Sequence, residues 1–466
     1  MQIIKHSHIV KKVNVFFRLM SLENKIDKML QIKHFRNLVD VQNILKLKPV
    51  ISIFILIFCL GCNSKKEHKI KVKEKITAAK ILGNPNYLAI SYGGYREKSR
   101  EAQPTIAQLK EDLKLMYAMG VRIIRTYNVQ SKLLHAANVL EAIHQLKKED
   151  DSFEMYVMLG AWIDCLNAWT DKAPNHEFES PQNEGEIARA VALANKYPEI
   201  VKIIAVGNEA MVKWATSYYV QPNVILKWVN HLQNLKKENK LSKDLWITSS
   251  DDFASWGGGD LSYKVKDLEA LIKAVDYVSM HTYAYHNSHY NPAFWKVPAN
   301  EQGLSDQEKI DNAMKRALKF AQTQYNEVSK YVKSIDSTKT IHIGETGWAT
   351  ISNGYYGVDR SRATDEYKQG LYYNHIRNWT NKAGISCFYF EAFDEQWKDA
   401  ANPKGSENHF GLINLKGEAK YPIWDLVDKG VFKDLKRDGK TITKTFNGDI
   451  DELMKTVLVP NTEYKR

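Results

Sequence analysis

Two glutamates stand directly after apolar runs of the kind that form buried strands. The run at 200–206 ends in Val206-Gly207-Asn208-Glu209, and the run at 340–344 continues into Glu345-Thr346-Gly347-Trp348. Two carboxyl groups beside a glycosidic bond are the minimum needed to hydrolyse it, because one donates a proton to the leaving oxygen while the other attacks the anomeric carbon or activates water. Either glutamate alone would be a weak indication. Their matching positions on two strands make Glu209 and Glu345 the candidate catalytic pair.

Such a pair requires a fold that gathers strand ends, and the chain alternates strand-like runs with amphipathic segments. The apolar runs cover residues 87–92, 121–127, 154–160, 200–206, 245–249, 276–282, 340–344 and 385–391. Eight such units in one domain predict an α/β fold, the closed (β/α)8 TIM barrel, whose strand ends meet at one mouth. An open dinucleotide-binding sheet is disfavoured, because Ser91-Tyr92-Gly93-Gly94-Tyr95 does not match G-x-G-x-x-G.

Four motifs in order resemble the family 17 glycoside hydrolases, the β-1,3-glucanase family of the clan A barrels. Besides the two glutamate motifs, they are Phe390-Glu391-Ala392-Phe393-Asp394-Glu395-Gln396-Trp397-Lys398 and Glu407-Asn408-His409-Phe410-Gly411-Leu412. The ends of strands one and six depart from the family pattern. The resemblance implies a retaining, endo-acting hydrolase of laminarin-type β-1,3-glucan, with Glu209 as the acid/base and Glu345 as the nucleophile of a covalent glycosyl-enzyme intermediate. Retaining enzymes hold these carboxyl groups about 5–5.5 Å apart, and we expect that separation here.

The two glutamates need opposite protonation states. Glu209 must be protonated, which requires a pKa raised by desolvation and by the charge of Glu345. Glu345 must stay ionised, which requires hydrogen-bond donors, and the hydroxyl of Tyr283 is the candidate. Asn208 would hold the sugar 2-hydroxyl, a contact that strengthens in the transition state.

Three charged residues of the later motifs are candidates for a supporting role. The resemblance implies that Glu395, Lys398 and Glu407 form an ion-pair network that positions Glu209 or tunes its pKa. The alternative is a salt bridge at the barrel rim, which would contribute little. Strand-eight ends face the mouth, which favours the functional interpretation.

Aromatic and polar residues near the strand ends are candidates for sugar binding. Tyr92, Arg125 and Tyr127 would bind hydroxyls and stack a ring, although each also suits core or rim packing. Trp348, directly beyond the nucleophile, is predicted to be the main aromatic platform, and Phe393 a second one.

Long aromatic loops follow strands three and six, at 161–175 and 285–303, and insertions there would build glucan subsites. His281, His286 and His289 lack carboxylate or cysteine companions with metal-ligand spacing, so hydrogen bonding is the expected role. We expect neither a metal nor a cofactor.

The amino-terminal residues predict export and lipid anchoring. Val50–Leu60 is an uncharged run of eleven residues, too short for an ordinary membrane-spanning helix but typical of a signal peptide. It is followed by Gly61 and Cys62, which resemble a bacterial lipobox with Cys62 as the lipidated residue. We therefore expect an export segment at 1–61, a Lys-rich tether at 62–85, and a protein anchored in the bacterial cell envelope by its lipid.

The remaining chain is predicted to be a catalytic barrel at 86–430 with a small C-terminal extension at 431–466 packed on it. The extension contains a possible hairpin around Arg437-Asp438-Gly439-Lys440. Cys165 and Cys387 lie at or near strand-like runs, so buried free thiols are favoured over a disulfide.

The net charge of +12 is confined to the amino-terminal part of the chain. Residues 1–61 have a surplus of 7 positive charges and residues 62–80 a surplus of 5, so residues 81–466 are formally neutral. Nucleic acid is therefore disfavoured as a partner. We expect a monomer that binds β-glucan. A β-1,3-glucan transglycosylase and, less favoured, a non-catalytic tethered glycan-binding protein are the alternatives.

Overall fold

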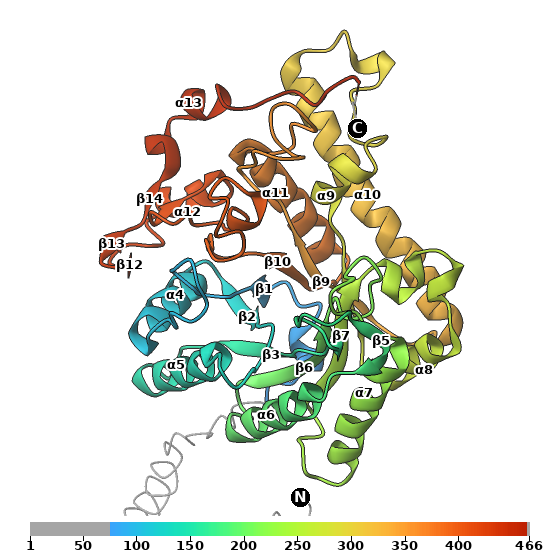
Figure 1. Ribbon diagram of the computed structural model, residues 1–466. Helices are drawn as coiled ribbons and strands as arrows, with labels where there is room; N and C mark the ends of the chain where they lie inside the picture. Colours follow the sequence, from blue (N-terminus) through green and yellow to red (C-terminus); the bar gives the residue numbers. More distant parts are fainter. Residues whose placement is uncertain (1–74, 464–466) are drawn as a thin grey trace, which may run out of the picture. The chain divides into compact units, whose positions relative to one another are not determined.

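The structure, a computed structural model, describes residues 75–463, and its centre is a closed barrel of eight parallel strands (Figure 1). Around the barrel the order is β1-β2-β3-β6-β7-β8-β9-β10. The strands are β1 (Leu88–Ser91), β2 (Val121–Arg125), β3 (Tyr156–Ala161), β6 (Val201–Asn208), β7 (Trp246–Asp252), β8 (Val278–His281), β9 (Ile341–Gly347) and β10 (Cys387–Phe390). Each predicted run overlaps one of them, so the TIM barrel prediction is confirmed.

Helices cover the outside of the barrel between the strands (Figure 1). They are α4 (Ile106–Ala118), α5 (His135–Glu149), α6 (Gln182–Lys196), α7 (Pro222–Lys237), α8 (Lys266–Ala274), α10 (Asp306–Ile335) and α11 (Glu366–Lys382). Helices α4 and α10 each begin with a capping box, in which the side chains of Thr105 and Ser305 accept from the third backbone N–H of the helix. Local sequence therefore sets where these helices start.

The barrel interior is apolar near the strand starts and polar near the strand ends. Ala89, Ile123, Met158, Ile203 and Phe388 form one buried cluster, while the residue after each of them belongs to the larger cluster between strands and helices. This alternation is the two-residue period of a strand. At the other end the interior residues are Ser91, Arg125, Ser250, Ser279, His281 and Glu345, all buried. The polar end is the mouth of the barrel.

A short helix, α3 (Ala78–Ile81), closes the opposite end. Ala78 and Ile81 are fully buried in the apolar cluster of the barrel interior. The predicted tether at 62–85 is therefore too long, because residues from about 77 onward belong to the fold. A single turn of helix is too short for its apolar spacing to repeat, so it cannot be recognised within a Lys-rich sequence. Residues 1–61 and Cys62, with the predicted signal and lipidation, lie outside the described residues.

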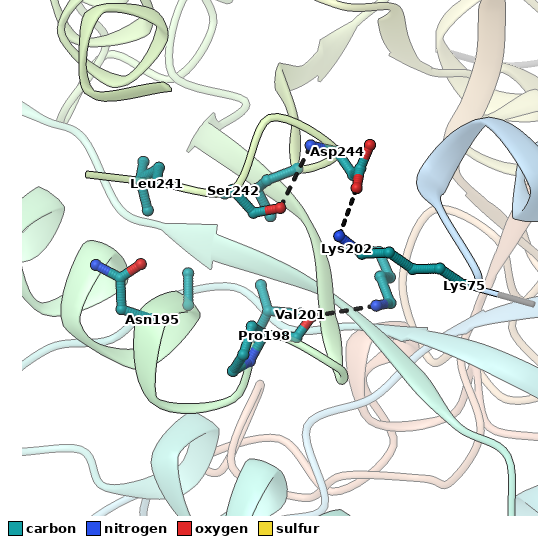
Figure 2. Close-up of a pocket in the computed structure, with 10 residues that line it drawn as sticks. Lys75, Asn195, Pro198, Val201, Lys202, Leu241, Ser242 and Asp244 are labelled. Carbon is teal, nitrogen blue, oxygen red and sulfur yellow. Dashed lines mark hydrogen bonds and ion pairs between the residues drawn. The ribbon is translucent and has the colours of Figure 1, made fainter. Parts of the chain in front are cut away.

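A small pocket lies at the same end of the barrel (Figure 2). It is lined by Val201 and Lys202 at the start of β6 and by Lys75, whose Nζ lies 2.6 Å from Asp244 Oδ2. Glu209 follows the other end of β6, and at about 3.3 Å per residue the two positions are roughly 25 Å apart. This pocket is therefore separate from the mouth.

The loops after the strands carry the smaller elements. They are β4 (Cys165–Leu166), β5 (Asn175–Glu179), a π-helix (Ala254–Gly258), α9 (Ala284–Tyr290), 3-10 turns (Leu261–Tyr263, Ala299–Glu301 and Ser406–Asn408) and β11 (Glu418–Ala419). The long loop after β3 forms the antiparallel pair β4–β5, and that after β8 forms α9. Both loops rise from the mouth.

The C-terminal part packs against the first helix of the barrel. It contains a 3-10 turn (Tyr421–Ile423), α12 (Trp424–Asp428), β12 (Lys436–Arg437), β13 (Lys440–Thr441), β14 (Thr443–Lys444), a 3-10 turn (Thr445–Gly448) and α13 (Ile450–Met454). The antiparallel β12–β13 pair is the predicted hairpin. Arg437 Nε donates to buried Asp112 Oδ1 of α4 at 2.9 Å, which ties the extension to the barrel.

The prediction on the two cysteines can be checked at this level. Cys165 and Cys387 are free and buried, as expected. Among residues 75–463, none of the helices has the length and hydropathy of a membrane span.

Candidate active site

A sharp bend at the end of β6 directs Glu209 into the mouth. Gly207 has φ +83°, a value that side chains disfavour, and Glu209 itself has φ +47°. The pairing with β7 shifts register between Ala205 and Asn208, and Glu209 N donates to Ser250 O at 2.9 Å. A non-glycine residue in the left-handed region is held there by its surroundings, and such strain is concentrated at functional sites.

Glu345 lies within β9 and faces the barrel interior. The preceding Gly344 leaves no room for a side chain, because a Cβ there would lie 2.1 Å from Ser279 Oγ. Tyr283 Oη donates to Glu345 Oε1 at 2.7 Å, and the guanidinium of Arg125 forms an ion pair with Oε2. Both carboxylate oxygens therefore have a donor, and Tyr283 lies where the sequence predicted it.

The two carboxyl groups converge. One oxygen of Glu209, one oxygen of Glu345 and a ring nitrogen of His281 all lie within 4.8 Å of one another. Two oxygens this near are expected for the carboxyl groups of retaining glycosidases, which lie about 5–5.5 Å apart, rather than for those of inverting ones, which lie about 6.5–9.5 Å apart. The geometry leaves room for attack by Glu345 itself.

The surroundings give the two glutamates opposite charge states. Burial raises the pKa of Glu209 to about 8, and the negative charge of Glu345 adds to this effect more than Arg125 offsets it. Burial would also raise the pKa of Glu345, but the charge of Arg125 and the hydroxyl of Tyr283 bring it below its ordinary value. At neutral pH Glu209 is thus protonated, as an acid must be, and Glu345 is ionised, as a nucleophile must be.

His281 determines which carboxyl oxygen of Glu209 carries the acidic proton. Burial lowers its pKa to about 4, so the imidazole is neutral at pH 7. Its Nε2 lies 3.4 Å from Arg125 Nη2, which can only donate, so Nε2 is the acceptor and Nδ1 carries the hydrogen. Nδ1 lies 3.0 Å from Glu209 Oε1. Because Oε1 accepts this hydrogen bond, the acidic proton is left on Oε2.

Arg125 was predicted to bind sugar hydroxyls, and in the structure its guanidinium is engaged by the catalytic site itself. It is buried, and besides Glu345 it contacts the side-chain oxygen of Asn208. Because Arg125 occupies that oxygen, the amide NH2 of Asn208 remains for a sugar hydroxyl. The ring centroid of half-buried Tyr127 lies 4.8 Å from the guanidinium carbon of Arg125. The predicted contact of Tyr127 with a sugar stays a prediction.

The Glu209–His281–Glu345 triplet has the spacing of a possible metal-binding group. Arg125 already places a permanent positive charge beside Glu345 and His281. A cation would have to displace it or accept the repulsion between like charges. Proton chemistry between the two glutamates is the simpler use of this arrangement.

The charged network at strand eight differs from the predicted one. Lys398 Nζ contacts Glu391 Oε2 at 2.6 Å and Glu395 Oε2 at 3.2 Å, and Glu395 Oε1 accepts from Tyr95 N at 2.8 Å. None of these contacts reaches Glu209, so the network supports the loops around the mouth rather than the acid/base directly. Burial, with Glu395 as a further cause, raises the pKa of Glu391 well above its ordinary value.

Sequence reasoning missed Glu391, although it lies inside a recognised motif, because an acidic residue at a strand end is usually solvated. Glu407, the third predicted member, makes no contact with Lys398 that would join it to this group. Its negative charge is the smallest of the causes that raise the pKa of Glu209, so its tuning role stays a prediction.

Three predicted sugar-binding residues are core residues instead. Trp348 is fully buried and donates from Nε1 to Ala363 O at 2.7 Å. Tyr92 is buried with its hydroxyl 3.0 Å from Asp112 Oδ2. Phe393 is buried beneath Arg437, whose guanidinium carbon lies 4.3 Å from the ring centroid. The predictions for these three were wrong, because each ring packs away from the mouth.

Five exposed aromatic side chains lie on the loops of the mouth, and all are more than half exposed. Trp169 and Phe178 follow β3, Trp214 follows β6, and Tyr290 and Tyr355 follow β8 and β9. His289 stacks on Tyr355 with ring centroids 4.2 Å apart and planes 16° apart. These positions lie in loops without periodicity, which is why sequence reasoning identified the loops but not the residues.

Comparison with known proteins gives similarities to glycoside hydrolases. A sequence model described as the BtgE/BtgC glycoside hydrolase domain matches residues 89–411. The crystal structure of an endo-laminarinase from Formosa Hel1_33_131 is 63% identical, covers 84% of this chain and 99% of that one, and superposes with a TM-score of 0.82.

Two curated fungal relatives are more distant. A glucan 1,3-beta-glucosidase of Candida albicans is 27% identical over 313 residues, 65% of this chain and 82% of that protein. The putative glucan endo-1,3-beta-glucosidase btgC of Aspergillus niger is 26% identical over 299 residues, 61% of this chain. The match spans 36% of the Aspergillus protein, so this chain corresponds to about a third of it.

Proposed function

Because the chain belongs to the BtgE/BtgC glycoside hydrolase domain family, we propose that it is a retaining endo-β-1,3-glucanase acting on laminarin-type β-glucan. The observation that carries the proposal is the convergence of a protonated Glu209 and an ionised Glu345 in one barrel mouth. The substrate class is supported by the endo-laminarinase from Formosa, which is 63% identical over 99% of its length.

The first chemical step breaks the glycosidic bond. A carboxylate oxygen of Glu345 attacks the anomeric carbon and forms an ester bond to it, while the bond from that carbon to the bridging oxygen breaks. Glu209 Oε2 gives its proton to the bridging oxygen, so the leaving sugar departs as a neutral alcohol. Positive charge develops on the ring, and the amide of Asn208 holds the sugar 2-hydroxyl.

The second step releases the bound sugar. Glu209, now ionised and held by Nδ1–H of His281, removes a proton from a water molecule. The water oxygen bonds to the anomeric carbon as the ester to Glu345 breaks. Two inversions give a product with the original β configuration, and both glutamates return to their starting charge states.

The decisive experiment is an activity assay of the purified protein on laminarin, mixed-linkage glucan and cellulose. We expect laminarin to be cleaved best, with intermediate oligosaccharides early in the reaction, and the new reducing ends to be β-anomers in proton NMR. Glu345→Gln should abolish release while oligosaccharide binding is retained. Binding by the wild-type protein without release would support the glycan-binding alternative and contradict the proposal.

The same assay separates hydrolysis from transfer. The covalent intermediate can react with a sugar hydroxyl instead of water, and the product would then be longer than the substrate. Incubation with laminarihexaose at high concentration reports on this directly. If most products are longer than six units, the protein is a transglycosylase rather than a hydrolase.

We also propose that the protein is lipid-anchored through Cys62 in a bacterial cell envelope. The support is the uncharged run Val50–Leu60 followed by Gly61 and Cys62. Expression of wild type and Cys62→Ser in a bacterial host, with fractionation of membranes, tests it. The wild type should sediment with membranes and the variant should not; equal partitioning would contradict the proposal.

A further inference from the structure

Three aromatic side chains form a group on the rim above β3 and β6. Trp169 and Tyr218 stack with ring centroids 5.1 Å apart and planes 24° apart. Trp162 lies 5.1 Å from Tyr218 and 6.4 Å from Trp169. We call these three residues the rim stack. Tyr218 and Trp162 are half-buried, whereas Trp169 is 63% exposed, so this large indole is accessible to solvent.

A buried carboxylate holds the rim stack in place. Trp162 Nε1 donates to Asp164 Oδ2 at 3.3 Å, and Trp169 is a second side-chain donor to the same carboxylate. Asp164 is itself anchored, because its backbone N–H donates to Asn183 Oδ1 at 3.2 Å and its carbonyl accepts from Ser180 N at 2.9 Å. An exposed tryptophan that merely filled space would need no such attachment.

The backbone under Trp169 is also constrained. Trp169 has φ +62°, and Asn167 two residues earlier has φ +64°. A bulky residue in the left-handed region is a true outlier, and such strain is maintained where a ligand contact depends on it. Thr170 Oγ1 donates to Asn167 O at 2.8 Å, and Asn167 Nδ2 to Ala173 O at 3.2 Å, which close this turn. The loop therefore presents the indole in one orientation.

The rim stack lies on the acid/base side of the catalytic pair. The chain leaves β6 through Glu209 and Ala210, then folds back so that Val220 N donates to Ala210 O at 2.7 Å. Tyr218, two residues before Val220, is thereby returned to the neighbourhood of Glu209. The backbone N–H of Cys165 donates to Tyr218 O at 3.0 Å and joins the loop after β3 to this turn. Glu345 lies across the mouth on β9.

From this geometry we propose that the rim stack is a sugar-binding subsite for the leaving-group part of the glucan, beyond the bond that Glu209 protonates. The inference rests on the proposed function. The general acid must lie beside the bridging oxygen, so the departing chain extends on the side of Glu209. A flat indole backed by a phenol suits the apolar face of a glucose ring, and Asp164 acts as the positioning residue.

The binding test uses the inactive Glu345→Gln protein, which keeps laminarihexaose intact. We expect Trp169→Ala in this background to raise the calorimetric Kd for laminarihexaose about tenfold, as loss of one aromatic contact does. Asp164→Ala should weaken binding similarly, because both indoles lose their anchor. Trp379→Ala, a half-buried tryptophan of α11 that packs on Tyr325 outside the barrel, is the matched control and should leave Kd unchanged. Thermal unfolding of each variant confirms that it is folded.

The side of the cleft is tested with active protein and laminarihexaose labelled at its reducing end. Labelled fragments are the leaving-group fragments, and Trp169→Ala should make them shorter because the distal subsite is lost. An unchanged Kd, or labelled fragments that become longer, overturns the inference. If the wild type cleaves laminarin while either result is obtained, only the inference fails; if the wild type cleaves no β-glucan, the proposed function fails as well.

Discussion

Removal of the Tyr283 hydroxyl isolates what keeps Glu345 ionised. In Tyr283→Phe the carboxylate loses the 2.7 Å hydrogen bond to Oε1 but keeps its ion pair with Arg125 on Oε2. A hydrogen bond to a charged group contributes about 1.5–3 kcal/mol. One pKa unit corresponds to about 1.4 kcal/mol, so the pKa of Glu345 should rise by about 1–2 units.

The pH dependence of kcat/KM reports this change. Its acid limb follows the ionisation of Glu345 in the free enzyme, and in the variant it should move to higher pH by that amount. The alkaline limb, set by Glu209 with its pKa near 8, should stay in place while Glu345 is ionised. Initial rates on laminarin across the pH range, at substrate concentrations well below KM, give both limbs.

Tyr372→Phe is the matched control. Its hydroxyl lies 2.8 Å from Thr346 Oγ1, next to the nucleophile along the chain, but makes no contact with the carboxylate. This variant should leave both limbs unmoved. If Tyr283→Phe lowers kcat without moving the acid limb, then Tyr283 acts on the sugar and the explanation of the Glu345 charge state is wrong.

Three further expectations follow from the same contacts. Gly207→Ala should reduce activity and cost about 1–3 kcal/mol of stability, because φ is +83° and the added Cβ would lie 2.8 Å from its nearest neighbour; laminarin assays and denaturant unfolding measure both. Lys398→Met should lower stability by about 3–5 kcal/mol, because Glu391 and Glu395 lose their buried cation, and an unchanged unfolding midpoint would argue against the network. Glu209→Gln should raise Tm over that of the wild type more near pH 8.5 than near pH 5. The pKa of Glu209 is about 8 in the folded protein and 4.5 ordinarily, so the unfolded chain releases this proton first and the wild type loses stability as pH rises between these two values.

The barrel and the catalytic pair could be predicted because their sequence patterns are local. Eight apolar runs gave the strands, and the motifs around Glu209 and Glu345 gave the resemblance to the β-1,3-glucanase family, which the family match and the 63% identical endo-laminarinase confirm. Strand periodicity also explains two of the errors. Since Glu345 faces inward, Trp348 three residues later faces outward, where it packs 5.0 Å from Tyr372 of α11.

The same period applies to β1 and β2. Ala89 faces the interior, so Tyr92 faces α4, whereas Arg125 shares the inward face with Ile123 and reaches the nucleophile. Counting alternate residues from one inward position is enough to sort these side chains. The rim stack had no such regularity, because Trp169 depends on two left-handed residues in a loop and on a contact with Asp164. Sequence alone does not predict that kind of loop geometry.

The burial of α3 at the base of the barrel has a consequence for how a polymer reaches the site. Ala78 and Ile81 seal the pole opposite to Glu209 and Glu345, so the chain enters the folded unit at that pole. The first residues that the structure describes, from Lys75 onward, thus lie at the end of the barrel opposite the open cleft. Neither α3 nor the residues just before it stand between an approaching glucan chain and the two glutamates, so a polymer can reach them without passing this end of the barrel.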